Sequence, residues 1–188
     1  MSTFFEVVTD DITFANRWFL DEPLTTASEA IDARLFRYGV SYHNHAPHRV
    51  PIQQEGVRVE FNLGAFDMPV VSREVLDHIP PAYLTDCEIY PVVIGNGVNG
   101  FSILNVVRRI ACVDELRSSI MKWNVEDERP DKIGCYRAVG DLHIVSSLAR
   151  EYDIFRIDGW EVPLIVSERF KSSIEDISNL GISFVPVT

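Results

Sequence analysis

The stretch from residue 153 to residue 188 constrains the fold most, because it reads as strand, turn, strand, helix and strand in direct succession. Ile154, Phe155 and Ile157 are residues that favour a strand, and the Asp158-Gly159 pair that follows is a strong two-residue turn signal. The apolar run 162–166 predicts a second strand, and residues 182–187 predict a third. A chain that ends this way is expected to build a sheet with short helices packed on it.

The helix in this stretch has a clear start and a clear apolar face. Ser167 can accept a hydrogen bond from a backbone N–H of the first turn, and Glu168 places a carboxylate at the positive end of the helix dipole. One face repeats at helical spacing, which predicts burial of Phe170, Ile174 and Ile177. Gly181 follows Leu180 and is expected to end the helix, because glycine adopts the left-handed conformation at little cost.

A similar unit occurs 95 residues earlier in the chain. At that offset Ser72 corresponds to Ser167, Ile79 to Ile174 and Pro91 to Pro186. Internal duplication would explain the likeness, and so would chance, because helix-start signals are common. Under either explanation we expect both units to contribute to one sheet.

The fold class that these patterns predict is α+β, with one domain over residues 1–188 and a mixed or antiparallel sheet carrying a few short helices. Residues 1–60 contain no motif, and residues 68–188 form the expected core with both units. The expected strands are 3–8, 57–62, 87–94, 101–110, 153–157, 163–166 and 182–187. The expected helices are 72–79 and 167–177, with shorter ones from Asp10 and over 114–122, and residues 125–132 are expected to be a charged loop.

The charge balance restricts the class of partner. The chain has 28 acidic and 17 basic residues, which gives a net charge of −11. Nucleic acids and anionic membranes are bound by clustered Lys and Arg, so neither is an expected partner, whereas a basic partner is compatible. No signal peptide is recognisable, and Cys87, Cys112 and Cys135 form no paired motif. We therefore expect reduced core thiols and a cytoplasmic protein.

The segment Gly95 to Gly100 matches GxGxxG, the fingerprint of dinucleotide-binding loops. That chemistry requires a helix after the loop, whose N-terminus faces the pyrophosphate. Here the loop is followed by a run rich in β-branched residues at strand spacing, and it contains two Asn-Gly pairs. The pattern favours a β-hairpin that binds no cofactor, with a nucleotide-binding loop as the alternative.

Three histidines offer a second alternative, a metal site formed by His43, His45 and His48. No Cys, Asp or Glu lies beside them, and zinc sites show closer ligand spacing, so we expect a polar loop and no metal. The sequence also lacks the serine-nucleophile elbow, the phosphate-binding P-loop and the HExxH zinc motif. The prediction is a protein that is not an enzyme.

A family resemblance follows from segments in the second half of the chain. The run Phe101 to Asp114 has the form aromatic-x-x-Leu-Asn-Val-Val followed by x-Cys-Val-Asp. The pair Phe155-Arg156 follows later in the chain. The tail contains Ile165-Val166-Ser167 and then Leu180-Gly181-Ile182-x-Phe184-x-Pro186. In this order they resemble the Imm11-type immunity proteins, also called the DUF1629 family, of bacterial polymorphic toxin systems. The resemblance covers the second half well and extends loosely back to Met68. It implies a non-catalytic cytoplasmic protein that binds a cognate toxin domain.

Two acidic clusters are the candidate partner-binding residues. If the toxin acts on nucleic acids or nucleotides, it is expected to have a basic cleft, and carboxylates could then stand in for phosphates. The alternative is that both clusters only keep the protein soluble. The candidate residues are Asp10, Asp11, Asp21, Glu22, Glu126, Asp127, Glu128 and Asp131.

Overall fold

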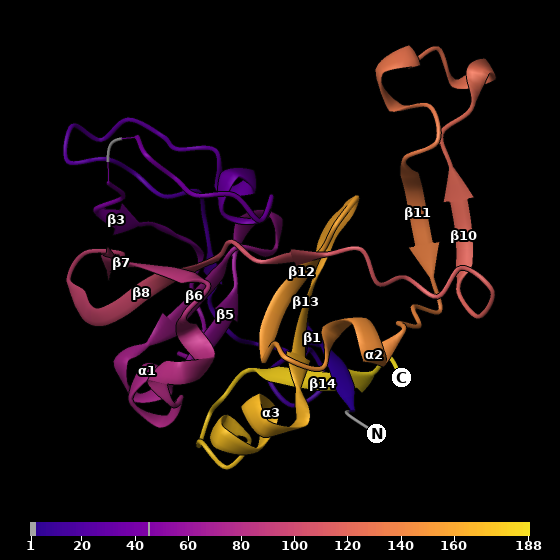
Figure 1. Ribbon diagram of the computed structural model, residues 1–188. Helices are drawn as coiled ribbons and strands as arrows, with labels where there is room; N and C mark the ends of the chain where they lie inside the picture. Colours follow the sequence, from indigo (N-terminus) through magenta and orange to yellow (C-terminus); the bar gives the residue numbers. More distant parts are fainter. Residues whose placement is uncertain (1–2, 45) are drawn as a thin grey trace.

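Two five-stranded sheets form the body of the protein, and the chain passes between them (Figure 1). The computed structural model describes residues 3–44 and 46–188. The α+β class and the single domain are as predicted. Besides three short α-helices, the described chain contains 3₁₀ helices η1 (Ala33–Phe36), η2 (Ala65–Asp67), η3 (Pro81–Leu84), η4 (Val125–Asp127) and η5 (Pro130–Lys132).

The first sheet contains the earlier of the two similar units. Its strand order is β3 (Arg49–Val50), β7 (Cys87–Ile94), β8 (Val98–Val106), β6 (Pro69–Ser72) and β5 (Phe61–Leu63). Helix α1 (Arg73–His78) follows β6 directly, as predicted, and Val75 N–H donates to Ser72 Oγ at 3.3 Å.

The second sheet contains the C-terminal unit. Its strand order is β14 (Ile182–Pro186), β1 (Phe4–Thr9), β13 (Trp160–Ser167), β12 (Ile154–Ile157) and β9 (Arg109–Ile110). Helix α3 (Glu168–Ile174) follows β13, and Phe170 N–H donates to Ser167 Oγ at 3.2 Å. Gly181 has φ +86°, but the helix ends earlier, at Ile174, so the residue shapes the entry to β14 instead of the helix end.

The prediction that both units contribute to one sheet is wrong, and so is the prediction of an unbroken strand over 101–110. Strand β8 ends at Val106, and β9 belongs to the other sheet. Between them Val107 N–H donates to Asp86 O at 2.9 Å, and Arg156 N–H donates to Arg108 O at 2.8 Å. The backbone of these neighbouring residues thus bonds first to one sheet and then to the other, which makes this the crossing point.

The likeness of the two units extends to the sheets around them. The order β7-β8-β6-β5 in the first sheet has its counterpart in β14-β1-β13-β12 of the second, and every neighbouring pair in both sets is antiparallel. Strand β1, from the start of the chain, takes the place that β8 takes in the first sheet. The sequence showed only the similar helix starts, so the shared topology strengthens the duplication hypothesis.

Apolar side chains form three clusters, one between the sheets and one on the outer face of each. The central cluster includes Val75 of α1 and Phe170 and Ile174 of α3, all fully buried, with Ile177 at 8% exposure. The predicted buried face of the C-terminal helix is therefore confirmed. The outer cluster of the first sheet includes Trp18 and Phe36, and that of the second sheet includes Ala149 of α2 (Ser146–Ala149).

The N-terminal segment differs from its predicted structure at two places. Residues 11–16 form turns instead of a helix, because Asn16 O accepts from Val57 N–H at 2.8 Å and the chain turns away to pair with that segment. The strand expected over 57–62 shrinks to β5, because Val57 bridges to Arg17 and lies outside the sheet. Strand β2 (Phe19–Leu20) pairs with β4 (Ile52–Gln54) and covers the first sheet with the rest of this segment.

A two-stranded arm projects from the body (Figure 1). We call residues 114–141 the arm; it contains β10 (Ser119–Lys122) and β11 (Tyr136–Gly140), which pair antiparallel. The helix predicted over 114–122 is wrong, because a turn at Asp114 leads into β10, whose partner strand lies beyond the tip. The predicted charged loop over 125–132 is confirmed as the tip and contains η4 and η5.

The cysteines are not all in the core. Cys112 is buried and Cys87 is partly buried, whereas Cys135 is exposed on the arm, so the prediction of a core thiol is wrong for Cys135. Burial raises the pKa of the Cys87 and Cys112 thiols to about 12. None of the helices in the described chain is long and apolar enough to cross a membrane.

Candidate partner-binding surface

The arm has no apolar core of its own. The structure describes residues 114–141 completely, and none of them is a buried hydrophobic residue. Instead the arm exposes large apolar side chains, with Leu116 at 98% and Val125 at 80% exposure, and Met121 and Ile133 about half exposed. Exposed apolar side chains gathered on one projecting element are typical of interaction surfaces.

Polar and cation–π contacts hold the arm in shape. Glu115 links both strands, because its carboxylate accepts from Tyr136 Oη at 2.6 Å and pairs with Lys122 Nζ at 2.8 Å. Trp123 has Lys132 Nζ at 5.4 Å and the Arg137 guanidinium at 4.9 Å from its ring centroid. Such contacts are worth about 0.5–1 kcal/mol each at exposed sites, so they shape the arm without making it an independent core.

A cleft of about 320 Å³ separates the arm from the body; we call it the arm cleft. Its arm wall consists of Trp123, Lys132, Cys135 and Tyr136. Its body wall consists of Arg37 and Tyr38, which follow η1, and of the turn and strand start Gly159, Trp160, Glu161 and Val162. Three segments far apart in the sequence therefore meet at this cleft.

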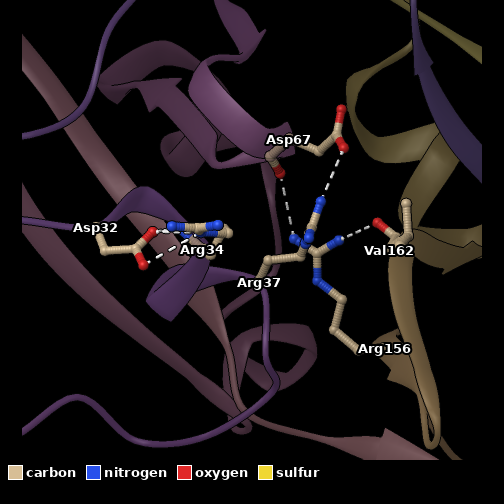
Figure 2. Close-up of polar contacts among 6 residues, drawn as sticks. All are labelled: Asp32, Arg34, Arg37, Asp67, Arg156 and Val162. Carbon is tan, nitrogen blue, oxygen red and sulfur yellow. Dashed lines mark hydrogen bonds and ion pairs between the residues drawn. The ribbon is translucent and has the colours of Figure 1, made fainter. Parts of the chain in front are cut away.

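A buried arginine, Arg156, contacts Val162 of the body wall; Figure 2 shows its polar contacts. Arg156 in β12 is fully buried; its Nη1 donates to Val162 O at 2.9 Å, and its Nη2 lies 3.5 Å from Asp67 O. The Asp67 carboxylate pairs with Arg37 Nη1 at 3.4 Å. Burial, together with the nearby Arg37, lowers the pKa of Arg156 to about 9, against an opposing effect of Asp67, and the side chain is still charged at neutral pH.

This network connects the two sheets at the cleft. Asp67 belongs to the loop between β5 and β6, whereas Arg156 and Val162 belong to the second sheet. A buried charged group is costly without hydrogen-bond partners, so the Arg156 guanidinium holds the Val162 and Asp67 carbonyls in place. The network therefore fixes the relative position of Arg37 and Val162, which both line the arm cleft.

The arm cleft offers more donors than acceptors. In the described part of the chain, the Tyr38 hydroxyl and the indole N–H groups of Trp123 and Trp160 make no hydrogen bond, and Lys132 makes no ion pair with a carboxylate. The one carboxylate on its walls, Glu161, already accepts from Gly159 N–H at 3.0 Å and pairs with Arg109 at 3.5 Å. Chemically, the cleft is suited to a ligand group that accepts hydrogen bonds.

The two predicted acidic clusters lie on different elements. Glu126, Asp127, Glu128 and Asp131 lie at the tip of the arm, whereas Asp10, Asp11, Asp21 and Glu22 lie on the body at and beyond the end of β1 (Figure 1). Several of these carboxylates already have partners: Asp11 pairs with Arg17, Asp127 with Arg137 and Asp131 with Arg129.

The carboxylates of Glu126 and Glu128 have no ion-pair partner in the described chain, and both residues are exposed. These two are therefore the acids of the arm tip that are available to another molecule. Contact of either cluster with a partner stays a prediction.

The glycine segment forms the predicted hairpin. Ile94 pairs with Val98 across a turn at 95–97, and the strand β8 follows where a dinucleotide loop needs a helix. Of the three histidines, His43 and His48 are exposed and His45 lies outside the described residues, so the metal alternative stays a hypothesis. The described residues include no group of three His, Cys, Asp or Glu placed to hold a metal ion.

The sequence did not indicate a second cavity, of about 460 Å³, beside α1. It brings His48 together with Asn99 and Gly100 at the end of the glycine segment, and with the exposed pair Arg73 and Asp77 of α1. Leu76 and Phe101 are among the apolar residues that line it.

Comparison with known proteins identifies the class. The family model described as an immunity protein family, Imm11, matches residues 95–188, which include β8, the arm and the whole C-terminal unit. The chain belongs to the Imm11 immunity protein family. The predicted resemblance is thereby confirmed for the second half, and residues before 95 lie outside the match. No curated protein matches the chain.

Proposed function

We propose that this protein binds a cognate protein toxin and neutralises it by occlusion, without catalysis. Membership of an immunity-protein family supports a toxin as partner. The observation that carries the proposal is that the matched region contains the arm, whose exposed apolar side chains and core-free construction are typical of a binding element. A protein that acts by occlusion needs such a surface and needs no reactive group.

The acidic balance fits this role. With a net charge of −11, the protein favours association with a basic partner and discourages binding to nucleic acid. We infer that both acidic clusters contribute to the field that attracts the toxin, with Glu126 and Glu128 the more available at the arm tip. The protein would act in the cytoplasm, where a toxin that attacks nucleic acids or nucleotides finds its target.

Coexpression of the chain with the toxin domain encoded beside its gene tests the proposal. We expect growth to be restored and the two purified proteins to elute as one complex. Titration against toxin activity should reach full inhibition at one equivalent, because occlusion consumes one binding protein per toxin. Absence of both rescue and complex would refute the function, and inactivation by a small fraction of an equivalent would show that the protein is an enzyme.

A further inference from the structure

The walls of the arm cleft carry the residue types that dominate protein–protein binding energy. Trp, Tyr and Arg are enriched among hot-spot residues, and here Trp123, Trp160, Tyr38, Tyr136 and Arg37 line one cleft of about 320 Å³. Tyr38 is exposed and the other four are partly exposed. By contrast, the third tryptophan is used internally: the indole of Trp18 donates to Asn62 Oδ1 at 2.7 Å in the core.

The charges of the cleft indicate what would enter it. Lys132 has no carboxylate partner in the described chain, and Arg37 has one long ion pair, at 3.4 Å to Asp67. Glu161 is already bonded and Arg37 is paired with Asp67, so the side-chain groups of the cleft without a polar partner in the described chain are the Lys132 ammonium and the donors of Tyr38, Trp123 and Trp160. A carboxylate is the group that such a site binds most strongly, because charge-assisted hydrogen bonds are about twice as strong as neutral ones.

The position of the cleft links it to the family. Of the ten residues that line it, all but Arg37 and Tyr38 lie within the matched region 95–188. By contrast, seven of the eleven residues that line the larger cavity beside α1 precede residue 95. A surface that serves the function of the family is therefore better sought at the arm cleft.

The construction of the arm also suits docking. An isolated two-stranded hairpin is marginally stable in water, and the described arm residues add no member to the three core clusters. A segment inserted between the arm and the body would bury aromatic faces on both walls and hold the arm in place.

We propose that the arm cleft is the toxin-docking site, and that it takes a projecting toxin segment with a carboxylate-bearing side chain at its tip. This inference rests on the proposed immunity function. The donors of Tyr38, Trp123, Trp160 and Lys132 receive the carboxylate and the neighbouring backbone carbonyls. The free acids of the arm tip, Glu126 and Glu128, attract basic residues of the toxin around that segment.

Cys135 provides a direct probe of the cleft. It is exposed and lines the cleft, whereas Cys87 and Cys112 are shielded and have thiol pKa values near 12. A maleimide reacts with the thiolate, so it should label Cys135 much faster than the other two. We expect saturating toxin to slow labelling of Cys135 by at least tenfold. An unchanged labelling rate in a stable toxin complex would overturn the proposed site.

Substitutions on both walls of the cleft test the docking site without relying on Cys135. Trp123→Ala on the arm and Tyr38→Ala on the body should each weaken toxin binding by about 30-fold, the loss typical of hot-spot residues. Lys132→Glu should have a similar effect, because it repels the carboxylate. Ile12→Ala is the matched control, since Ile12 is 96% exposed on a turn away from the cleft. Unfolding curves of all variants show whether each remains folded.

The outcomes separate the docking site from the function. If the unaltered protein protects cells while all three cleft variants bind like the control, the docking site is wrong and the immunity function stands. If the unaltered protein neither protects cells nor binds toxin, the docking site and the immunity function are both refuted. Sedimentation of the protein alone tests whether a second copy of the chain occupies the cleft. A dimer in which Cys135 is protected would assign the cleft to self-association and overturn the proposal.

Discussion

The body and the arm of this protein are stabilised in different ways. In the body, two sheets with a corresponding order of four antiparallel strands share a central apolar cluster, and helices α1 and α3 contribute fully buried side chains to it. In the arm, ion pairs, a tyrosine–glutamate hydrogen bond and cation–π contacts replace a core, and the apolar side chains face outward. One chain thus contains an element built for stability and another that leaves its apolar surface for other contacts.

The difference indicates that the body provides stability and the arm provides a binding surface. Shortening a side chain in a packed interior lowers the free energy of unfolding, because the cavity left behind is only partly filled. A surface element tolerates the same change with little loss of stability, so its residues are free to serve binding. We expect substitutions in the body to change stability first, and substitutions in the arm to change binding first.

Shortening a core side chain is the strongest test of this division. Phe170→Ala removes a fully buried ring from the central cluster and should lower the free energy of unfolding by about 3–5 kcal/mol. Met121→Ala on the arm, at 55% exposure, should change it by less than about 0.5 kcal/mol. Urea unfolding followed by tryptophan fluorescence measures both. A Phe170→Ala protein that unfolds at the same urea concentration as the unaltered one would show that the apolar cluster does not stabilise the body.

Hydrogen bonds that cap helix starts give a smaller contrast of the same kind. Ser167→Ala removes a bond from Phe170 N–H and a 2.5 Å bond to Asp153, so it should cost about 1–2 kcal/mol of global stability. Asn124→Ala removes the acceptor for Glu126 N–H at the arm tip, where opening is local.

We expect faster amide hydrogen exchange at Glu126 in the Asn124→Ala protein and no shift of its unfolding midpoint. Ser72→Ala is the control in the first sheet, with an expected cost of about 1 kcal/mol. Equal losses of global stability from Ser167→Ala and Asn124→Ala would mean that the arm unfolds together with the body.

Local patterns were enough to predict most of the body. The Asp158-Gly159 turn, the Asn96-Gly97 turn and the Ser-initiated helices were predicted correctly, because each signal lies within a few residues of the structure that it specifies. The Asn99-Gly100 pair, also expected in the turn, lies inside β8. The failures involve distant partners. Residues 119–122 have the composition of a short helix but become a strand, since they pair with residues 136–140 across the tip.

The candidate site was harder to predict than the fold. The sequence suggested acidic residues because charge runs are visible in it, but it did not suggest Arg37, Tyr38, Trp123 or Trp160. These residues meet only because the arm lies against the turn between β12 and β13 and the segment after η1. The buried Arg156 was likewise visible only as part of a family motif, because its partners Val162 O and Asp67 O come from separate loops and strands.

The acidic clusters offer the smallest and most specific comparison of arm and body. Glu126 and Glu128 are exposed at the arm tip without ion-pair partners in the described chain, whereas Asp11 on the body pairs with Arg17 and Asp10 accepts hydrogen bonds from Ile12 and Thr13 N–H. Replacing both tip residues with Gln should lower the toxin association rate by about tenfold at low salt and flatten its dependence on salt, because unpaired exposed charges steer encounter. Replacing Asp10 and Asp11 with Asn should change the rate by less than about twofold, and neither pair should alter the dissociation rate much. Stopped-flow mixing across a salt series measures these rates, and a larger effect from the body pair than from the tip pair would move the docking surface away from the arm.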